Sequence, residues 1–316
     1  MKLLKSNLLY LSMLSFVLIA SSALALASDF DRSIKEVNLI KSLGSTSNYP
    51  ALPQLADSTT TYPVFSGQAV LALDLDSGVT LYEKNADAAV APASTTKIIT
   101  ALVAMDYYNL KQELTISGIS VEGQKMGLEE GEKITVKDLL YGLLVYSAND
   151  AAEALAKGYC SDVNCGREFF ISAMNKKAYQ LGLRNTNFVN PSGLDNATHY
   201  ATAKDLVKAS VEAMKNPLFA QIVATKTATV YSQDKKIVHK LANINELLGS
   251  VDGVLGIKTG WTENARENLV TYVERNGHRV VIALLGSQDR FGETTELIDW
   301  IFSNYTWTEV AYSYSP

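Results

Sequence analysis

Histidine and cysteine are scarce in this chain of 316 residues, which contains three histidines and two cysteines. His199, His239 and His278 lie far apart and form no His-x-x-His or Glu-x-x-His pair. Because a catalytic zinc needs about three protein ligands drawn from His, Cys and carboxylates, the sequence offers no metal site. We therefore expect neither a metal nor a cofactor.

Positive charge is also in short supply. The chain has 28 Lys and Arg against 33 Asp and Glu, a formal net charge of -5. Nucleic-acid-binding proteins present basic patches to phosphate backbones, and no Lys/Arg run interleaved with aromatic residues occurs. Nucleic acid is therefore not an expected partner. A Gly-x-Ser-x-Gly element is missing too, which leaves little support for a Ser-His-Asp hydrolase.

Residues 1–27 are expected to direct export. Two lysines precede an apolar stretch over residues 8–27, which ends in the small-residue site Ala25-Leu26-Ala27. This layout is typical of a secretory signal peptide. The stretch is nearly long enough to span a bilayer, so a retained membrane anchor is the alternative. We expect a periplasmic protein, one on the outer face of the cytoplasmic membrane, or a secreted one.

The cysteines, Cys160 and Cys165, are separated by four residues. In an oxidising compartment they could close a small loop as a disulfide. Two sulfurs without a neighbouring histidine make a poor zinc site, because zinc needs four ligands. A disulfide is the favoured interpretation, and a reduced, inert pair is the alternative.

Composition separates a linker from a folded domain. Residues 28–63 include runs rich in Ser, Thr and Pro, which bury little surface and are typical of a tether. Alternating and apolar runs with turn signals predict a folded domain over residues 64–305, followed by a short tail over residues 306–316.

The order of the expected elements indicates an α+β fold. A hairpin is expected over residues 69–82, and helical spacing follows in the segments that contain Ile98, Leu140, Phe170 and Leu206. Thr135 and Thr202 are expected helix caps. Strands are predicted at residues 227–231, 254–258, 269–273 and 280–285, the last buried on both faces, and a helix at 297–302. One sheet built from both ends of the domain, with helices packed on it, accounts for this order.

Ser94 and Lys97 form a Ser-x-x-Lys element at the start of an expected helix. Residues three apart share a helix face, so the Lys97 amine can reach the Ser94 hydroxyl. A serine needs an adjacent base to act as a nucleophile, and an amine serves only when it is unprotonated. Burial and a second nearby cation would both lower the lysine pKa. The helix N-terminus would favour a developing oxyanion.

Alone, this element is weak evidence, and Ser94 is more simply a helix N-cap. A second copy, Ser232-Gln233-Asp234-Lys235, lies in a polar stretch and is interpreted as a solvated turn. Two further elements change the interpretation: Ser147-Ala148-Asn149 between two expected helices, and Lys258-Thr259-Gly260 at the end of an apolar strand. On an edge strand the latter offers a cation, a hydroxyl and main-chain groups to a peptide with a terminal carboxylate.

Ser-x-x-Lys, Ser-x-Asn and Lys-Thr-Gly together are the signature of penicillin-binding proteins and serine β-lactamases. Over residues 67–302 the chain most closely resembles the low-molecular-weight D-alanyl-D-alanine carboxypeptidases. The matching segments are residues 91–97, 146–152, 190–194 and 256–262. The resemblance implies a β-lactamase-like, penicillin-binding transpeptidase fold, in which an antiparallel sheet is flanked by helices and joined to a mainly helical subdomain.

The resemblance also implies catalytic roles. Ser94 would be the acylated nucleophile and Lys97 its base, while Ser147 would relay a proton and help to position Lys97. Backbone N–H groups of Ser94 and Trp261 would form the oxyanion hole.

Substrate-binding roles are implied for the remaining motif residues. Asn149 would bind the substrate backbone, Lys258 would add positive field, and Thr259 would bind the carboxylate of the departing D-alanine. Gly260 would let the substrate approach closely. The implied partners are peptidoglycan stem peptides ending in D-Ala-D-Ala and the β-lactams that acylate such enzymes.

Three alternatives to a D-alanyl-D-alanine carboxypeptidase stay open. A D,D-endopeptidase acting on cross-links would use the same residues. A class A-like β-lactamase needs a Glu that activates the deacylating water, and the nearest match to its motif, residues 212–216, lacks the leucine. A non-catalytic peptidoglycan-binding protein would be expected to have lost a motif residue, and none is lost.

Three residues carry weaker expectations. Arg266 stands where family members often carry glycine, which casts doubt on the strand geometry there. Arg290 is a carboxylate anchor by approximate position, but a surface ion pair is the favoured interpretation. His199 is expected to support the loop that follows Asn190-Pro191.

Overall fold

The computed structural model describes residues 50–161 and 164–309. The expected signal peptide or anchor and most of the expected linker lie outside this part of the chain. Within it, no helix is both long enough and apolar enough to cross a membrane.

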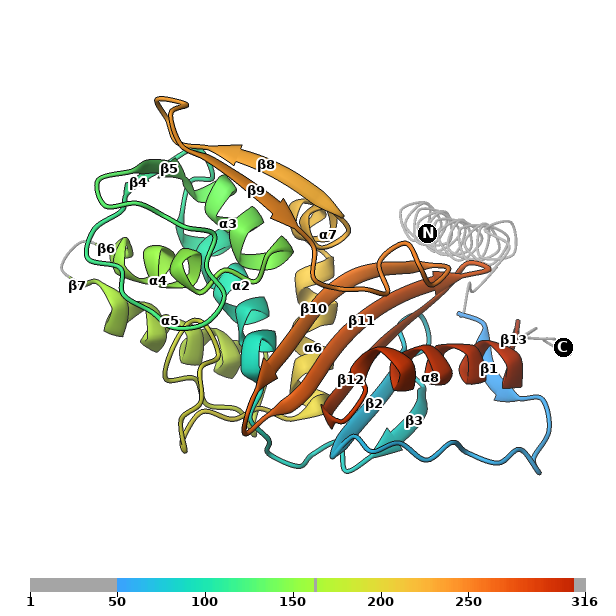
Figure 1. Ribbon diagram of the computed structural model, residues 1–316. Helices are drawn as coiled ribbons and strands as arrows, with labels where there is room; N and C mark the ends of the chain where they lie inside the picture. Colours follow the sequence, from blue (N-terminus) through green and yellow to red (C-terminus); the bar gives the residue numbers. More distant parts are fainter. Residues whose placement is uncertain (1–49, 162–163, 310–316) are drawn as a thin grey trace, which may run out of the picture. The chain divides into compact units, whose positions relative to one another are not determined.

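A five-stranded antiparallel sheet forms the centre of the described domain (Figure 1). Its strand order is β10-β11-β12-β2-β3. The strands are β2 (Ala69–Asp74), β3 (Thr80–Lys84), β10 (Val254–Thr262), β11 (Arg266–Arg275) and β12 (His278–Ser287). The early hairpin β2–β3 pairs with the late strand β12, as the sequence predicts. The Lys-Thr-Gly strand, β10, is an edge strand and pairs within the sheet only with β11.

Apolar side chains alternate between the two faces of this sheet. Val281, Ala283 and Leu285 of β12 face one hydrophobic core, which includes α6 (Ala203–Met214). The intervening residues Val280, Ile282 and Leu284 face a second core with α8 (Arg290–Asn304). Figure 1 shows α8 across one face of the sheet. Because helices cover both faces, the prediction that residues 280–285 are buried on both sides is confirmed.

A helical part packs beside the sheet and supports the two other motifs. It contains η1 (Ala93–Thr96), α2 (Lys97–Tyr107), α3 (Val136–Val145), α4 (Asn149–Lys157), α5 (Arg167–Gln180) and α7 (Pro217–Val223). The side chain of Thr135 accepts from Asp138 N at the start of α3, and Thr202 accepts from Asp205 N at the start of α6. Both predicted caps are therefore confirmed, and so is the α+β fold.

Short two-stranded sheets complete the domain. These are β4 (Glu113–Thr115) with β5 (Lys133–Thr135), β6 (Cys160–Ser161) with β7 (Asn164–Cys165), and β8 (Thr227–Tyr231) with β9 (Val238–Ala242). Cys160 and Cys165 face each other across β6–β7 and are joined by a disulfide. The second Ser-x-x-Lys copy forms the turn of the β8–β9 hairpin, where the Ser232 hydroxyl donates to Asp234.

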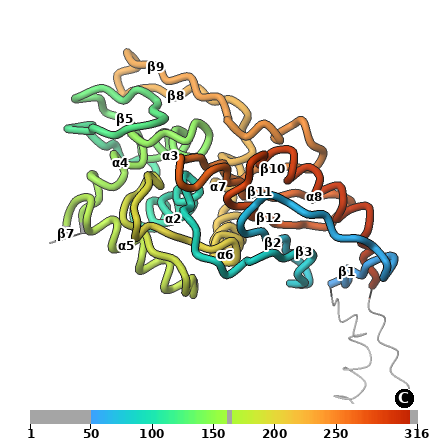
Figure 2. The backbone as a smooth tube through the Cα atoms, turned by 60° about the horizontal axis from the view of Figure 1, so that its bottom comes forward, coloured from blue at the N-terminus to red at the C-terminus, as the bar shows by residue number. Residues whose placement is uncertain are grey.

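The folded domain extends beyond both boundaries that the composition suggests. Strand β1 (Leu52–Leu55) lies in the expected linker and pairs with β13 (Tyr305–Thr308), which continues into the expected tail. Figure 2 shows these two ends side by side. The indole of Trp300 also donates to Thr61 O at 3.0 Å. Such pairing joins residues that are far apart in sequence, so no local pattern reveals it.

Arg266 is the first residue of β11, directly after the turn from β10, and has a φ of 56°. This left-handed conformation favours glycine because other residues have a Cβ that crowds the backbone. This conformation explains why glycine suits this position. The ladder from Ile257–Thr271 to Thr262–Arg266 is nevertheless continuous, and the arginine leaves the Lys-Thr-Gly strand in place.

Candidate active site

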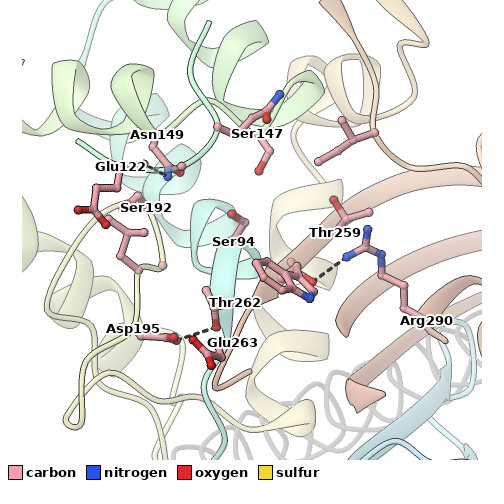
Figure 3. Close-up of a pocket in the computed structure, with 17 residues that line it drawn as sticks. Ser94, Glu122, Ser147, Asn149, Ser192, Asp195, Thr259, Thr262, Glu263 and Arg290 are labelled. Carbon is pink, nitrogen blue, oxygen red and sulfur yellow. Dashed lines mark hydrogen bonds between the residues drawn. The ribbon is translucent and has the colours of Figure 1, made fainter. Parts of the chain in front are cut away.

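The three motifs meet at one pocket of about 720 Å³. Ser94 lies at its centre, with Ser147 and Asn149 from the helical part on one side and Thr259 from β10 on the other (Figure 3). The pocket is also lined by Gly260, Trp261 and Arg290. The sequence thus identifies residues that the fold brings together although 165 positions separate Ser94 from Thr259.

Lys97 is fully buried directly behind Ser94. Its Nζ lies 2.8 Å from Ser94 Oγ, 2.7 Å from Asn149 Oδ1 and 2.6 Å from Ser192 O. Burial holds the pKa of Lys97 well below the usual lysine range, and the charge of Lys258 lowers it further. Desolvation outweighs the nearby carboxylates of Asp150 and Glu153, which raise it. The uncharged form of the Lys97 amine is therefore favoured more strongly than in a lysine exposed to water.

The hydrogen-bond partners of Lys97 determine where the N–H groups of its amine point. The carbonyl oxygens of Asn149 and Ser192 can only accept, so each takes one N–H of a neutral amine. The nitrogen lone pair is then left to face Ser94. In that arrangement the Ser94 hydroxyl donates to the amine, which is the orientation that proton abstraction requires.

Local backbone geometry presents Ser94 to the pocket. Ala93 has a φ of 48°, and the chain then enters η1 and α2. The N-cap residues of these two helices are Pro92 and Thr96, and neither forms a side-chain capping bond. The alternative that Ser94 is only an N-cap is therefore wrong.

Two glycines allow other segments to touch the Ser94 backbone. A Cβ on Gly193 would lie 1.8 Å from Ala93 O, and one on Gly260 would lie 3.1 Å from Ser94 N. Gly193 has a φ of 88°, which suits glycine. The loop after α5 and strand β10 thus hold the nucleophile between them.

Gly193→Ala is expected to lower the rate of covalent acylation by a penicillin about 100-fold, because its methyl group displaces the backbone that presents Ser94. Gly78→Ala is the matched control. Gly78 also has a positive φ, 72°, but a Cβ there meets nothing within 4 Å. Stopped-flow acylation measures the rates, and thermal melts report the stabilities. Equal acylation rates in the two variants would contradict this account.

Ser147 lies in the turn from α3 to α4, and Asn149 is the first residue of α4. Ser147 has a φ of 61° and lines the pocket. None of the hydrogen bonds between described residues involves its hydroxyl. Asn149 Oδ1 accepts from Lys97, while its Nδ2 donates to Glu122 O at 2.7 Å. Asn149 therefore also positions Lys97, a contact that the sequence motif does not reveal.

The strand side of the pocket carries positive charge. Burial and the charge of Arg290 lower the pKa of Lys258 to about 7, and its Nζ donates to Thr259 O at 2.9 Å. Thr259 Oγ1 and Arg290 Nε are buried and have no hydrogen-bond partner among the described residues. Arg290 Nη1 donates to Gly260 O at 3.0 Å. Arg290 therefore lines the pocket, and its interpretation as a surface ion pair is wrong.

Ser192 and its loop are functional features that residue-type reasoning missed. Asn190 Oδ1 accepts from the backbone N–H groups of Ser192, Gly193 and Leu194. This turn aims the Ser192 carbonyl at Lys97. Residues 190–194 match the family in sequence, which indicates that the segment matters. No side chain in it indicates that a main-chain oxygen has a role.

His199 braces the same loop against η1. Its Nδ1 accepts from Val189 N at 3.2 Å, and its Nε2 lies 2.8 Å from Thr96 Oγ1. Burial lowers the pKa of His199 to about 4, so the ring is neutral at pH 7 and Nε2–H donates to Thr96. The expected structural role is confirmed.

The acid that a class A β-lactamase needs is not supplied by residues 212–216. Glu212 is on α6, forms an ion pair with Lys215 and does not line the pocket. In residues 212–216, the nearest match to the class A β-lactamase motif, the glutamate therefore forms only a surface ion pair.

The chain is similar to known proteins in sequence and in structure. Residues 56–289 match the family described as D-alanyl-D-alanine carboxypeptidase. The D-alanyl-D-alanine carboxypeptidase DacF of Bacillus subtilis is 33% identical, over 75% of this chain and 62% of its own length. The D-alanyl-D-alanine endopeptidase of Pseudomonas aeruginosa is 30% identical, over 86% of this chain and 88% of its own. The crystal structure of the Streptomyces K15 DD-transpeptidase has a TM-score of 0.72 at 34% identity, covering 77% of this chain and 100% of that chain.

Proposed function

Because this chain belongs to the D-alanyl-D-alanine carboxypeptidase family, we propose that it removes the terminal D-alanine from peptidoglycan stem peptides through an acyl-enzyme on Ser94. The observation that carries the proposal is the buried Lys97 amine 2.8 Å from Ser94 Oγ. The whole motif set is retained around one pocket, which argues against a non-catalytic peptidoglycan-binding role.

The reaction begins when Lys97 takes the Ser94 proton and Oγ attacks the carbonyl carbon of the penultimate D-alanine. The backbone N–H groups of Ser94 and Trp261 would stabilise the oxyanion. Collapse of this intermediate breaks the C–N bond, and the leaving amine takes a proton relayed through Ser147. Water then hydrolyses the ester and restores Ser94. The position of Ser147 in the lining of the pocket supports the relay.

Thr259 and Arg290 would bind the carboxylate of the leaving D-alanine. Thr259 Oγ1 and Arg290 Nε are buried without partners, and leaving such groups unpaired costs about 1–3 kcal/mol each. A carboxylate would accept from both, with Lys258 adding positive field. This arrangement favours a substrate with a free C-terminus, and the same chemistry allows a β-lactam carboxylate to bind.

Endopeptidase activity on cross-links is the second candidate. It is favoured by the 30% identity to an enzyme of that name and by a wide overlap with it. Both reactions use the same nucleophile, so the structure of the site does not separate them.

Product analysis tests the assignment. Incubation of the protein with purified muropeptides is expected to release free D-alanine from pentapeptide stems, as measured by mass spectrometry. Conversion of cross-linked dimers into monomers, without D-alanine release, would assign the endopeptidase reaction. No change in either substrate would refute both.

We also place the protein outside the cytoplasm, since peptidoglycan is assembled there. The apolar sequence of residues 1–27 supports export, by a cleaved signal or a retained anchor.

A further inference from the structure

The charges that line the pocket are separated into two groups. Arg290 lies with Thr259 on one side of Ser94, and three carboxylates, Glu122, Asp195 and Glu263, lie on the other sides (Figure 3). Asp195 is held in place by Thr262, whose hydroxyl donates to it at 2.7 Å. Neither Glu122 nor Glu263 forms an ion pair with any described residue.

The buried hydroxyl of Thr259 indicates where one end of a ligand binds. Thr259 is only 2% exposed, lines the pocket, and has an unpartnered Oγ1. Together with Arg290 it fits the anionic end of a ligand. Glu267, the carboxylate that accepts from the Arg290 backbone N–H, does not line the pocket.

The edge strand β10 sets the direction in which a bound peptide runs, if the function proposed above is correct. The terminal carboxylate lies at Thr259 and the scissile carbonyl at the N–H of Trp261, so the peptide is antiparallel to β10. Each residue advances about 3.3 Å along a strand. The third residue from the peptide C-terminus therefore reaches Thr262 and Glu263.

We propose that Glu263 and Glu122, with the fixed charge of Asp195, select stem peptides whose third residue from the C-terminus carries a free ammonium group. We expect a side chain at that position to lie near the acidic rim of the pocket, which Glu122, Asp195 and Glu263 form. A cross-linked or acylated amine has lost its charge, so this selection favours stems that have not been cross-linked.

Two synthetic tripeptides test the selection. One is Nα-acetyl-L-Lys-D-Ala-D-Ala, with a free ammonium, and the other is its Nε-acetylated analogue. We expect kcat/KM for D-alanine release to be about fivefold higher for the ammonium substrate at low ionic strength, the size of one or two exposed ion pairs. The preference should fall in 0.5 M salt, about three times physiological ionic strength.

Variants test whether Glu122 and Glu263 cause the preference for the ammonium substrate. In the double variant Glu122→Gln, Glu263→Gln the ratio of the two kcat/KM values is expected to fall below about twofold. Glu113→Gln removes one negative charge from β4, outside the pocket, and should keep the full ratio.

The outcomes are distinguishable. Equal rates for both tripeptides with wild-type protein, or a preference that survives in the double variant, would overturn the selection and leave the carboxypeptidase assignment standing. Release of D-alanine from neither tripeptide would instead refute the proposed function.

Discussion

Ser94→Ala is expected to abolish covalent labelling by a fluorescent penicillin and to reduce D-alanine release at least about 1,000-fold. The acyl-enzyme requires an oxygen at this position, and alanine supplies none. The substitution removes only the hydroxyl oxygen of Ser94. The buried hydrogen bonds of Lys97 with Asn149 and Ser192 stay in place. The folded domain should therefore persist, and labelling on a denaturing gel reports the covalent bond alone.

The chain supplies its own control for this experiment. Ser232 belongs to the second Ser-x-x-Lys element, and its hydroxyl donates to Asp234 in a hairpin turn. Ser232→Ala should be labelled at the wild-type rate. Persistent labelling of Ser94→Ala, or loss of labelling in Ser232→Ala, would refute the identity of the nucleophile.

The two Ser-x-x-Lys copies also show what sequence can and cannot decide. Spacing alone is the same in both, and both place a lysine three residues after a serine. They differ in what surrounds them: Lys97 is fully buried at the start of α2, whereas Lys235 lies in the β8–β9 turn and itself has a φ of 60°. Apolar periodicity after Ser94, absent after Ser232, carried that difference in the sequence.

The sequence does not predict contacts that a main-chain group makes with a residue far away along the chain. Ser192 O accepts from Lys97, and strand β1 pairs with β13, but neither contact depends on a distinctive side chain. Arg290 was misassigned for a related reason. It begins α8, directly after an exposed turn, and only the packing of α8 on the sheet turns its side chain toward Gly260 O.

Lys97→Arg is expected to lower the acylation rate by a penicillin about 100- to 10,000-fold, the range that a positioned general base contributes. A guanidinium keeps its proton at any pH at which the protein is folded, so it has no lone pair for the Ser94 proton. Lys235→Arg in the second element provides a charge-matched control and should acylate at the wild-type rate.

The pH dependence of acylation tests the same base without a substitution. The pKa of Lys97 is lowered in the fold, so the amine is uncharged above that lowered pKa and gains a proton as the pH falls through it. Acylation should therefore decline only as the pH falls through that lowered pKa, unlike that of a base with an ordinary lysine pKa, which would become active only near about pH 10. Stopped-flow acylation from pH 5 to pH 10 measures the profile. A rate of the unmodified protein that rises only above pH 9 would contradict the lowered pKa of Lys97. Acylation of Lys97→Arg at the rate of the unmodified protein would exclude Lys97 as the base, because a guanidinium cannot accept the Ser94 proton.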